Sequence, residues 1–169
     1  VTGSGKTSVY IRLIRQALEE GKSALLLVPE IALTPQLLGK LTSHFGRQVA
    51  VLHSSLRVGE RFDEWRRIQS GEARVVVGTR SAVFAPAENL GLILVDEEQE
   101  HTYKSENAPR YHAREVAIYR GVQEGALVVL GSATPSVESM YFARSGVYSL
   151  YTMRQRYNGQ TLPAVEIVD

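Results

Sequence analysis

A glycine-rich run near the first residue constrains the fold of this chain more than any other feature. Residues 3–7 read Gly-Ser-Gly-Lys-Thr, which is the core of the P-loop motif G-x-x-x-x-G-K-[ST]. In such a loop, successive backbone N–H groups and the N-terminus of the following helix point at the same phosphate oxygens. The run therefore predicts a loop that leads into a helix and binds a phosphate-bearing ligand.

Each residue of the run has a predicted role in binding ATP. The backbone of Gly3 and Gly5 can approach the phosphates closely, because a glycine has no Cβ in the way, and Ser4 between them is predicted to bind nucleotide as part of the same loop. Lys6 is expected to reach the β- and γ-phosphates, and the Thr7 hydroxyl is expected to ligate Mg²⁺. A Gly/Ser turn that merely precedes a helix is the alternative for this run taken alone.

The position of the run indicates a segment of a longer protein. Counted backwards from Gly5, the first glycine of the motif would fall before Val1, together with the strand that feeds the loop. We therefore expect a chain that is cut inside its own nucleotide site. We also expect it to bind nucleotide weakly by itself.

Composition excludes several classes of protein. The chain has 169 residues, of which 44% are hydrophobic, so it can build one sizeable core. Its net charge is +1, from 19 basic and 18 acidic residues, so any contact with nucleic acid must come from local patches. It has no cysteine, which excludes disulfides and thiolate metal sites, so we expect no zinc in this chain and a reducing, cytoplasmic location. No apolar run approaches the ~18 residues that a transmembrane helix needs, and no membrane contact is expected.

Short apolar segments alternate with amphipathic ones along most of the sequence. Apolar runs predict buried strands at residues 23–28, 48–52, 74–77, 92–95 and 127–130, and an edge strand at 147–152. Helical spacing and capping residues predict helices at 6–20, 34–45, 58–70, 111–123 and 135–144, the third with Phe62, Trp65 and Ile68 facing inward. This alternation predicts an α/β fold with a mainly parallel sheet, helices on both faces, and ligand at the carboxyl ends of the strands. The domain is predicted at residues 1–153, and residues 154–169 are predicted to be a linker.

Acidic residues follow one of the predicted strands directly. Residues 92–99 read Leu-Ile-Leu-Val-Asp-Glu-Glu-Gln, a buried strand that ends in three acids. In a chain with a P-loop, Asp96 is predicted to hold Mg²⁺ and Glu97 to orient and deprotonate the attacking water. An acidic turn after a core strand is the alternative.

A second polar sequence follows the predicted strand at 127–130. It reads Gly-Ser-Ala-Thr at residues 131–134, and the hydroxyls of Ser132 and Thr134 can bridge the acidic motif to a coupled activity. A Ser/Thr turn that caps the following helix is the alternative, and Thr134 can serve in both.

The segment 101–112 interleaves aromatic and basic residues. The candidates within it are Tyr103, Lys104, Arg110 and Tyr111. Because bases stack on aromatic rings while cations meet phosphates, this composition predicts contact with single-stranded DNA. Arg80, which follows the end of another strand, is a further candidate for phosphate contact. The alternatives are that Tyr111 packs under the next helix and that Arg80 forms a surface salt bridge.

Three motifs follow one another along the chain: Gly-Ser-Gly-Lys-Thr, Asp-Glu-Glu-Gln and Ser-Ala-Thr. Their order resembles that of the first RecA-like lobe of superfamily 2 helicases. Longer strings resemble the PriA family of primosomal replication-restart helicases, and they lie at residues 28–36, 78–86, 108–114 and 131–136. The resemblance runs over residues 1–169. It implies the P-loop NTPase lobe of an ATP-dependent DNA helicase that moves 3′ to 5′ on branched DNA during replication restart.

The resemblance also assigns roles and partners. It implies phosphate binding by Lys6 and coupling of hydrolysis to DNA movement by Ser132 and Thr134, with primosome and replication proteins as partners of the full-length protein. A second lobe completes the site in such enzymes, so we expect this chain alone to be nearly inactive. The family usually has His where this chain has Gln99. Glutamine still donates and accepts hydrogen bonds, so we expect altered coupling without loss of hydrolysis.

Two alternatives to this function stay open. The chain can belong to another superfamily 2 translocase or to an RNA helicase, although typical RNA enzymes lack a segment like 101–112. It can also act as a module that binds single-stranded DNA or a protein without catalysis.

Overall fold

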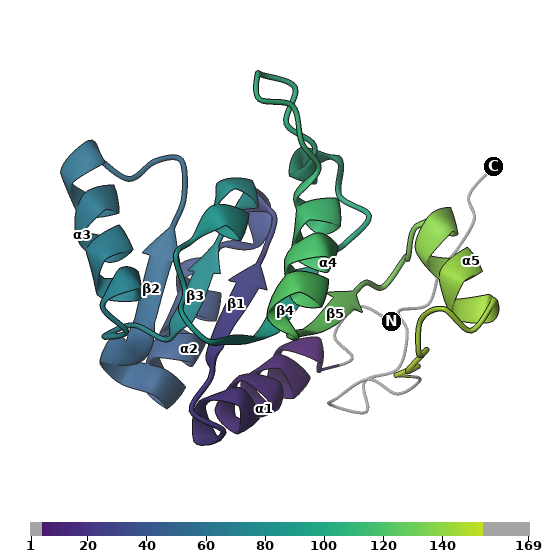
Figure 1. Cartoon of the computed structure of the whole chain (residues 1–169), viewed down its shortest axis with the longest axis horizontal. Coiled ribbons are helices and arrows are strands. Elements are labelled where there is room, and N and C mark those ends of the chain that lie inside the picture. Colours follow the sequence, from purple (N-terminus) through teal and green to yellow (C-terminus); the bar gives the residue numbers. More distant parts are fainter. Residues whose placement is uncertain (1–4, 154–169) are drawn as a thin grey trace, which may run out of the picture.

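Five parallel strands form the centre of the structure, a computed structural model that describes residues 5–153 (Figure 1). The strands are β1 (Ser23–Leu27), β2 (Val49–Leu52), β3 (Val75–Gly78), β4 (Leu90–Asp96) and β5 (Leu127–Gly131). They lie in the order β2-β3-β1-β4-β5. The predicted α/β fold with a parallel sheet is therefore confirmed.

Helices cover both faces of this sheet. On one face α1 (Lys6–Glu19) and α2 (Pro35–Phe45) contribute to one hydrophobic cluster, and on the other α3 (Val58–Gln69) and α4 (Ala113–Glu124) contribute to a second. The short helix α5 (Val137–Arg144) lies beside the sheet, past β5 (Figure 1). None of these helices combines the length and hydropathy needed to cross a bilayer.

The central strand β1 shows why helices must cover both faces of the sheet. All five of its residues are buried, and successive side chains point to opposite faces. Leu25 and Leu27 pack in the cluster with α3 and α4, while Ala24 and Leu26 pack with α1 and α2. Complete burial of one such leucine side chain contributes about 2 kcal/mol, so a continuous apolar strand is stable only between two layers.

Capping residues fix where the helices begin. Thr34 accepts a hydrogen bond from the Leu37 N–H at 3.2 Å and Pro35 opens α2, as predicted from the sequence. In α5 the cap is Ser136, which accepts from the Ser139 N–H at 3.2 Å. The prediction that Pro135 opens this helix is therefore wrong by two residues, because the serine provides the first side-chain acceptor.

The packing of α3 differs from the prediction. Ile68 is buried, but Phe62 is 59% exposed and Trp65 is 37% exposed. The reason is that α3 lies over β2, the edge strand, where only a narrow stripe of the helix is covered. Glu64 on this helix instead accepts a hydrogen bond from the Val51 N–H of β2 at 2.7 Å, which satisfies part of the strand's open edge.

Two further segments differ from the sequence-based expectation. Residues 147–152 form no strand, and the structure shows bends and irregular backbone there. Helix α4 begins at Ala113, two residues later than predicted.

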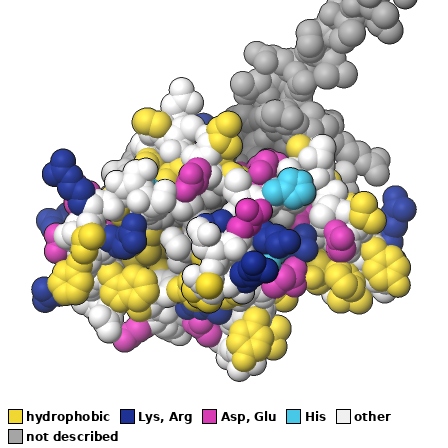
Figure 2. Space-filling model, turned by 90° about the horizontal axis from the view of Figure 1, so that it is seen from above, with side chains coloured by type: hydrophobic (Ala, Val, Ile, Leu, Met, Phe, Trp, Pro, Cys, Tyr) yellow, Lys and Arg dark blue, Asp and Glu magenta, His cyan; other side chains and the backbone are white. Residues whose placement is uncertain are grey.

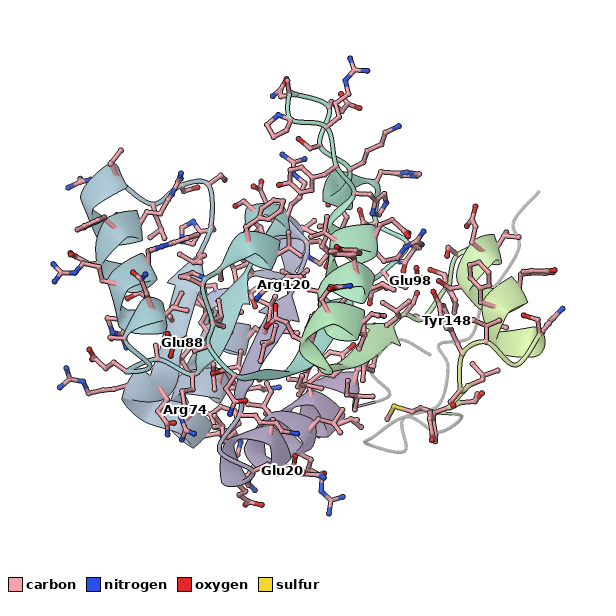
Figure 3. All side chains as sticks on the ribbon, viewed as in Figure 1. Glu20, Arg74, Glu88, Glu98, Arg120 and Tyr148 are labelled. Carbon is pink, nitrogen blue, oxygen red and sulfur yellow. The ribbon has the colours of Figure 1, made fainter. Side chains whose placement is uncertain are left out.

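Arg120 ties α4 to the 3₁₀ helix η3 (Arg80–Phe84) by donating to the carbonyls of Val83 and Ala85 at 2.7 and 3.1 Å (Figure 3). The predicted linker at residues 154–169 lies outside the described residues.

Candidate functional site

Three charged side chains, one from the start of the sequence and two from adjacent positions much later in it, meet at the carboxyl end of β4. The strand arrows in Figure 1 point towards this end, and Figure 2 looks down on it. Lys6, the first residue of α1, places its Nζ 3.1 Å from Asp96 Oδ1 and in contact with Glu97 Oε1. The structure thus brings the lysine of the glycine-rich run against the two acids predicted to serve metal and water.

Gly5, the one described residue before α1, has a backbone conformation typical of glycine. Gly5 has φ = 88°, in the left-handed region that glycine adopts without steric cost. It directly precedes Lys6 and the half-buried Thr7, and among residues 5–153 no side chain caps the first N–H groups of α1. These N–H groups are available to an anion. Gly3 and Ser4 lie outside the described residues.

The electrostatics of this cluster favour the charged forms of Lys6 and Glu97. Burial alone would lower the pKa of Lys6, but Glu97 and Asp96 outweigh it and raise the pKa above the ordinary value. Burial alone would raise the pKa of Glu97, but hydrogen bonds from Gln99 and Lys6 lower it. An ionised Glu97 can accept a proton, and a charged Lys6 can exchange its carboxylate partners for phosphate oxygens.

Glu97 is held in an unusual backbone conformation. Its φ is 47°, in the left-handed region, which is uncommon for a residue other than glycine and costs on the order of 1 kcal/mol. The Glu97 carbonyl accepts from the Glu100 N–H at 2.9 Å, which closes a tight turn directly after β4. Because of this turn, consecutive acids face different surroundings: Glu97 contacts Lys6, and Glu98 faces inward.

A chain of hydrogen bonds connects Glu97 to the Gly-Ser-Ala-Thr segment. Gln99 Nε2 donates to Glu97 Oε2 at 2.9 Å, and Ser132 Oγ donates to Gln99 Oε1 at 2.5 Å. Ser132 Oγ in turn accepts from the Thr134 backbone N–H at 2.9 Å. A neutral side chain with both a donor and an acceptor suits this place between a carboxylate and a hydroxyl.

Glu98 is a residue of the site that sequence reasoning missed. It is 1% exposed, and Figure 3 shows it between α4 and the segment that leads into α5. Arg114 of α4 donates to its Oε2 at 2.8 Å. The Ser136 N–H donates to Oε1 at 2.7 Å, and the hydroxyls of Ser136 and Ser139 donate to Oε2 at 3.1 and 3.0 Å. One carboxylate therefore joins the turn after β4 to two helices.

The environment of Glu98 keeps it ionised although it is buried. Burial alone would raise its pKa, but the Ser136 N–H, Arg114 and Ser139 together lower the pKa below the ordinary value. A third acid directly after the two predicted functional ones was the available signal in the sequence. Three adjacent carboxylates need separate partners, and Arg114 is the cation that Glu98 contacts.

Tyr103 lies in a different place from the one its role as a DNA contact requires. The side chain is 1% exposed, and its hydroxyl donates to the Asp96 carbonyl at 2.6 Å. A ring buried in this way has no open face on which a base can stack. It instead fixes the backbone at the end of β4.

The other candidates for nucleic-acid contact surround a cavity and a projecting loop. The cavity, of about 520 Å³, is lined by residues that follow β1, β2 and β3, with the segment 101–107 opposite them. Arg80 Nη1 donates to the carbonyls of Thr102 and Lys104 at 3.2 and 2.8 Å, so it anchors that segment. Figure 2 shows Lys and Arg side chains near the middle of this end of the molecule.

The loop itself is closed at its base. Lys104 pairs with His112 in an isolated antiparallel bridge, and the Ser105 N–H donates to the Tyr111 carbonyl at 2.7 Å. Residues 106–110 extend beyond this base and are exposed, and Figure 1 shows the loop projecting above α4. Lys104 and Arg110 are exposed, while the half-buried Tyr111 packs edge-to-face on Phe84 with ring centroids 4.9 Å apart.

Comparison with known families and proteins gives consistent results. The profile of the family described as DEAD/DEAH box helicase matches residues 1–141. The Replication restart protein PriA of Bacillus subtilis is 54% identical over the whole chain, and that of Treponema pallidum is 50% identical over the whole chain. The chain spans 21% and 26% of the length of these two relatives.

Solved structures show the same fold. RecG bound to a three-way DNA junction matches 85% of this chain and 18% of its own chain, with 26% identity and a TM-score of 0.60. A Saccharomyces cerevisiae Dbp5 variant bound to RNA and ADP BeF3 matches 83% of this chain and 34% of its own, with 19% identity and a TM-score of 0.59. The second likeness bears on the fold alone.

The Glu98 network yields a prediction about stability. Replacing Glu98 by Ala leaves the charge of Arg114 poorly compensated, and breaking a buried ion pair costs about 3–5 kcal/mol. We expect a loss of this size in the free energy of unfolding, measured by urea denaturation at neutral pH. As a control, Glu115→Ala removes a carboxylate that is 60% exposed and also contacts Arg114, and we expect a change below about 1 kcal/mol.

The stability difference between the wild type and Glu98→Ala should depend on pH. Since the pKa of Glu98 is lowered from 4.5 in the folded state, its contribution is present above that pH and is lost as the pH falls below it. The stability difference between wild type and Glu98→Ala should therefore shrink progressively as the pH falls below 4.5. A difference that stays constant with pH, or a loss as small as that of the control, would contradict the assignment.

Proposed function

The chain belongs to the DEAD/DEAH box helicase family, and from this premise we propose that it forms the ATP-binding lobe of an ATP-dependent DNA helicase that acts in replication restart. The names of the relatives confirm the resemblance to the PriA family. The observation that carries the proposal is the contact of Lys6 with Asp96 and Glu97, continued through Gln99 to Ser132. This arrangement connects a phosphate-binding residue to the segment expected to couple hydrolysis to movement.

The nucleotide would be held by the loop that ends at Gly5 and by Lys6. The positive end of the α1 helix dipole and the charge of Lys6 both favour an anion at this place. Phosphate oxygens would take over the lysine from its two carboxylate partners. The freed carboxylates would then be available to a metal ion and to water.

The residues present fit a magnesium ion that arrives with the nucleotide. Among residues 5–153, no group of three or more His, Asp or Glu side chains is arranged to hold a metal ion alone. Mg²⁺ is commonly bound through one or two carboxylates together with substrate phosphates. Asp96 and the Thr7 hydroxyl would hold it, and the ion would neutralise charge that develops on the phosphates.

Glu97 would position and deprotonate the attacking water. Its lowered pKa keeps it ionised at neutral pH, and its hydrogen bond from Gln99 fixes the carboxylate relative to Ser132. A second lobe would complete the site around the γ-phosphate, so we propose that the isolated chain turns over ATP negligibly, below about 1 s⁻¹.

Nucleic acid would bind at the cavity and the loop that follows β4. Lys104 and Arg110 are exposed on this loop, where cations can meet phosphates. Arg80 and Tyr111 would shape this surface through the contacts that anchor the loop. Tyr103 would contribute only indirectly, because it is buried and fixes the backbone at the end of β4. The same proposal includes movement from 3′ to 5′ and a preference for forked DNA. It also includes a cytoplasmic location and contact with primosome and replication proteins.

The decisive experiment measures ATP turnover by a longer protein that contains this chain and the flanking sequence of its relatives. Turnover is compared without nucleic acid and with single-stranded DNA, forked DNA and single-stranded RNA. Stimulation by DNA, strongest with the fork, supports the proposal. Stimulation by RNA favours an RNA helicase, and DNA binding without turnover favours a binding module, so either result contradicts it.

Glu97→Gln tests the catalytic assignment in that protein. The amide keeps the shape of the side chain but cannot accept a proton, so turnover should fall by about 100-fold or more. Nucleotide affinity should be retained, as measured with a fluorescent ADP analogue. The control is Glu138→Gln, an exposed residue of α5, which should leave turnover unchanged. Equal turnover in the Glu97 variant and the control would refute a general-base role.

Lys104→Ala and Arg110→Ala test the nucleic-acid surface. Each change should weaken binding to single-stranded DNA and reduce the slope of log affinity against log salt concentration by about 0.7, because one phosphate contact is lost. The control is Lys40→Ala, an exposed lysine of α2. Fluorescence anisotropy at several salt concentrations gives the slopes. Slopes that match the wild type would place the DNA elsewhere.

A further inference from the structure

Tyr10 is a buried residue that the proposed mechanism has not used. It lies four residues after Lys6 in α1, so the two side chains share one face of the helix. The residue is 5% exposed, and its ring packs in the cluster with Ile14, Leu92 and Leu94. Its hydroxyl, however, reaches out of this apolar cluster to the polar end of β4.

The hydroxyl of Tyr10 donates a hydrogen bond to Asp96. The distance from Oη to Oδ1 is 2.8 Å. Burial, and next to it the charge of Asp96, raise the pKa of Tyr10 far above its ordinary value, so the tyrosine keeps its proton and is the donor. Lys6 Nζ faces the same oxygen at 3.1 Å. Within residues 5–153, no side chain donates a hydrogen bond to the second oxygen, Oδ2.

Gly131 leaves room for the contact between this hydroxyl and Asp96, because it has no side chain. It pairs with Asp96 in the register of β4 and β5. A Cβ at Gly131 would overlap the Tyr10 hydroxyl oxygen and lie 3.5 Å from Asp96 Oδ1. The first residue of the Gly-Ser-Ala-Thr segment is therefore kept without a side chain at the point where α1, β4 and β5 meet.

We infer that Tyr10 is a positioning residue of the nucleotide site, which fixes the Asp96 carboxylate through Oδ1 and leaves Oδ2 as the oxygen that would hold a metal ion bound with the nucleotide. The Tyr103 hydroxyl donates to the backbone carbonyl of the same aspartate. Asp96 is therefore held at two points, its side chain and its backbone. Partners of this kind orient a metal ligand, and their loss typically costs about 10–100-fold in metal affinity or activity. The inference rests on the proposed nucleotide-binding function.

Tyr10→Phe removes the hydroxyl and keeps the buried ring. In the longer protein, the Mg²⁺ concentration that gives half-maximal binding of a fluorescent ADP analogue should rise about tenfold. Affinity for the analogue in EDTA should stay unchanged, and half-maximal Mg²⁺ for turnover should rise in parallel. The control is Tyr119→Phe, whose residue is 66% exposed on α4, and it should match the wild type.

Each result separates the inference from the function on which it rests. Unchanged Mg²⁺ dependence in Tyr10→Phe overturns the inference, and so does an equal loss of ADP affinity with and without Mg²⁺, since the residue would then serve packing alone. A wild-type protein without Mg²⁺-dependent nucleotide binding overturns the proposed function itself.

A second measurement needs no nucleotide. Gly131→Ala should lower the urea midpoint of unfolding strongly when Tyr10 is present and less when position 10 is Phe, because the added methyl group overlaps the hydroxyl. Non-additivity of this sign supports the contact among Tyr10, Gly131 and Asp96. Equal shifts in the two backgrounds would show that the hydroxyl does not lie over Gly131 and would overturn the inference.

Discussion

The parallel register of β4 with its neighbours is the constraint on which the site depends. Pairing of Asp96 with Gly131 places the last residue of one strand beside the first residue of the Gly-Ser-Ala-Thr segment. Because parallel strands end at one edge of the sheet, α1, the acidic turn and the segment after β5 converge there. A shift of one residue in this register would turn every side chain of β4 to the opposite face, and Asp96 would no longer meet Lys6.

The acidic turn shows how three adjacent carboxylates acquire three environments. Asp96 ends the strand and is contacted by Lys6 and two tyrosine hydroxyls. The left-handed backbone at Glu97 then reverses the chain, so that Glu97 stays at the site while Glu98 enters the interior. Burial of a charge is unfavourable unless partners compensate it, and Glu98 receives them from Arg114, Ser136 and Ser139.

Much of the fold could be predicted because its signals are local. The runs that became β1 to β5 are continuous apolar segments, and Thr34 with Pro35 marks the start of α2. The predicted burial of 127–130 is wrong, because β5 lies at the edge of the sheet and none of its residues is buried. The inward face of α3 could not be predicted, since Phe62 and Trp65 have helical spacing but the helix covers an edge strand. The burial of Tyr103 could not be predicted for a similar reason. An aromatic residue among cations suits either a DNA surface or a core, and only its neighbours in space distinguish the two.

The sequence by itself determined the residue types of the site, the order of its motifs and the alternation that leads to a parallel sheet. These features depend on local spacing and on the chemistry of single residues. Only the tertiary structure decided that Glu98 is buried against Arg114, that Tyr103 supports Asp96 from the core, and that Tyr10 reaches the same residue across Gly131. Each of these contacts joins residues on different elements, and their geometry is set by the packing of helices on the sheet, which no local pattern encodes.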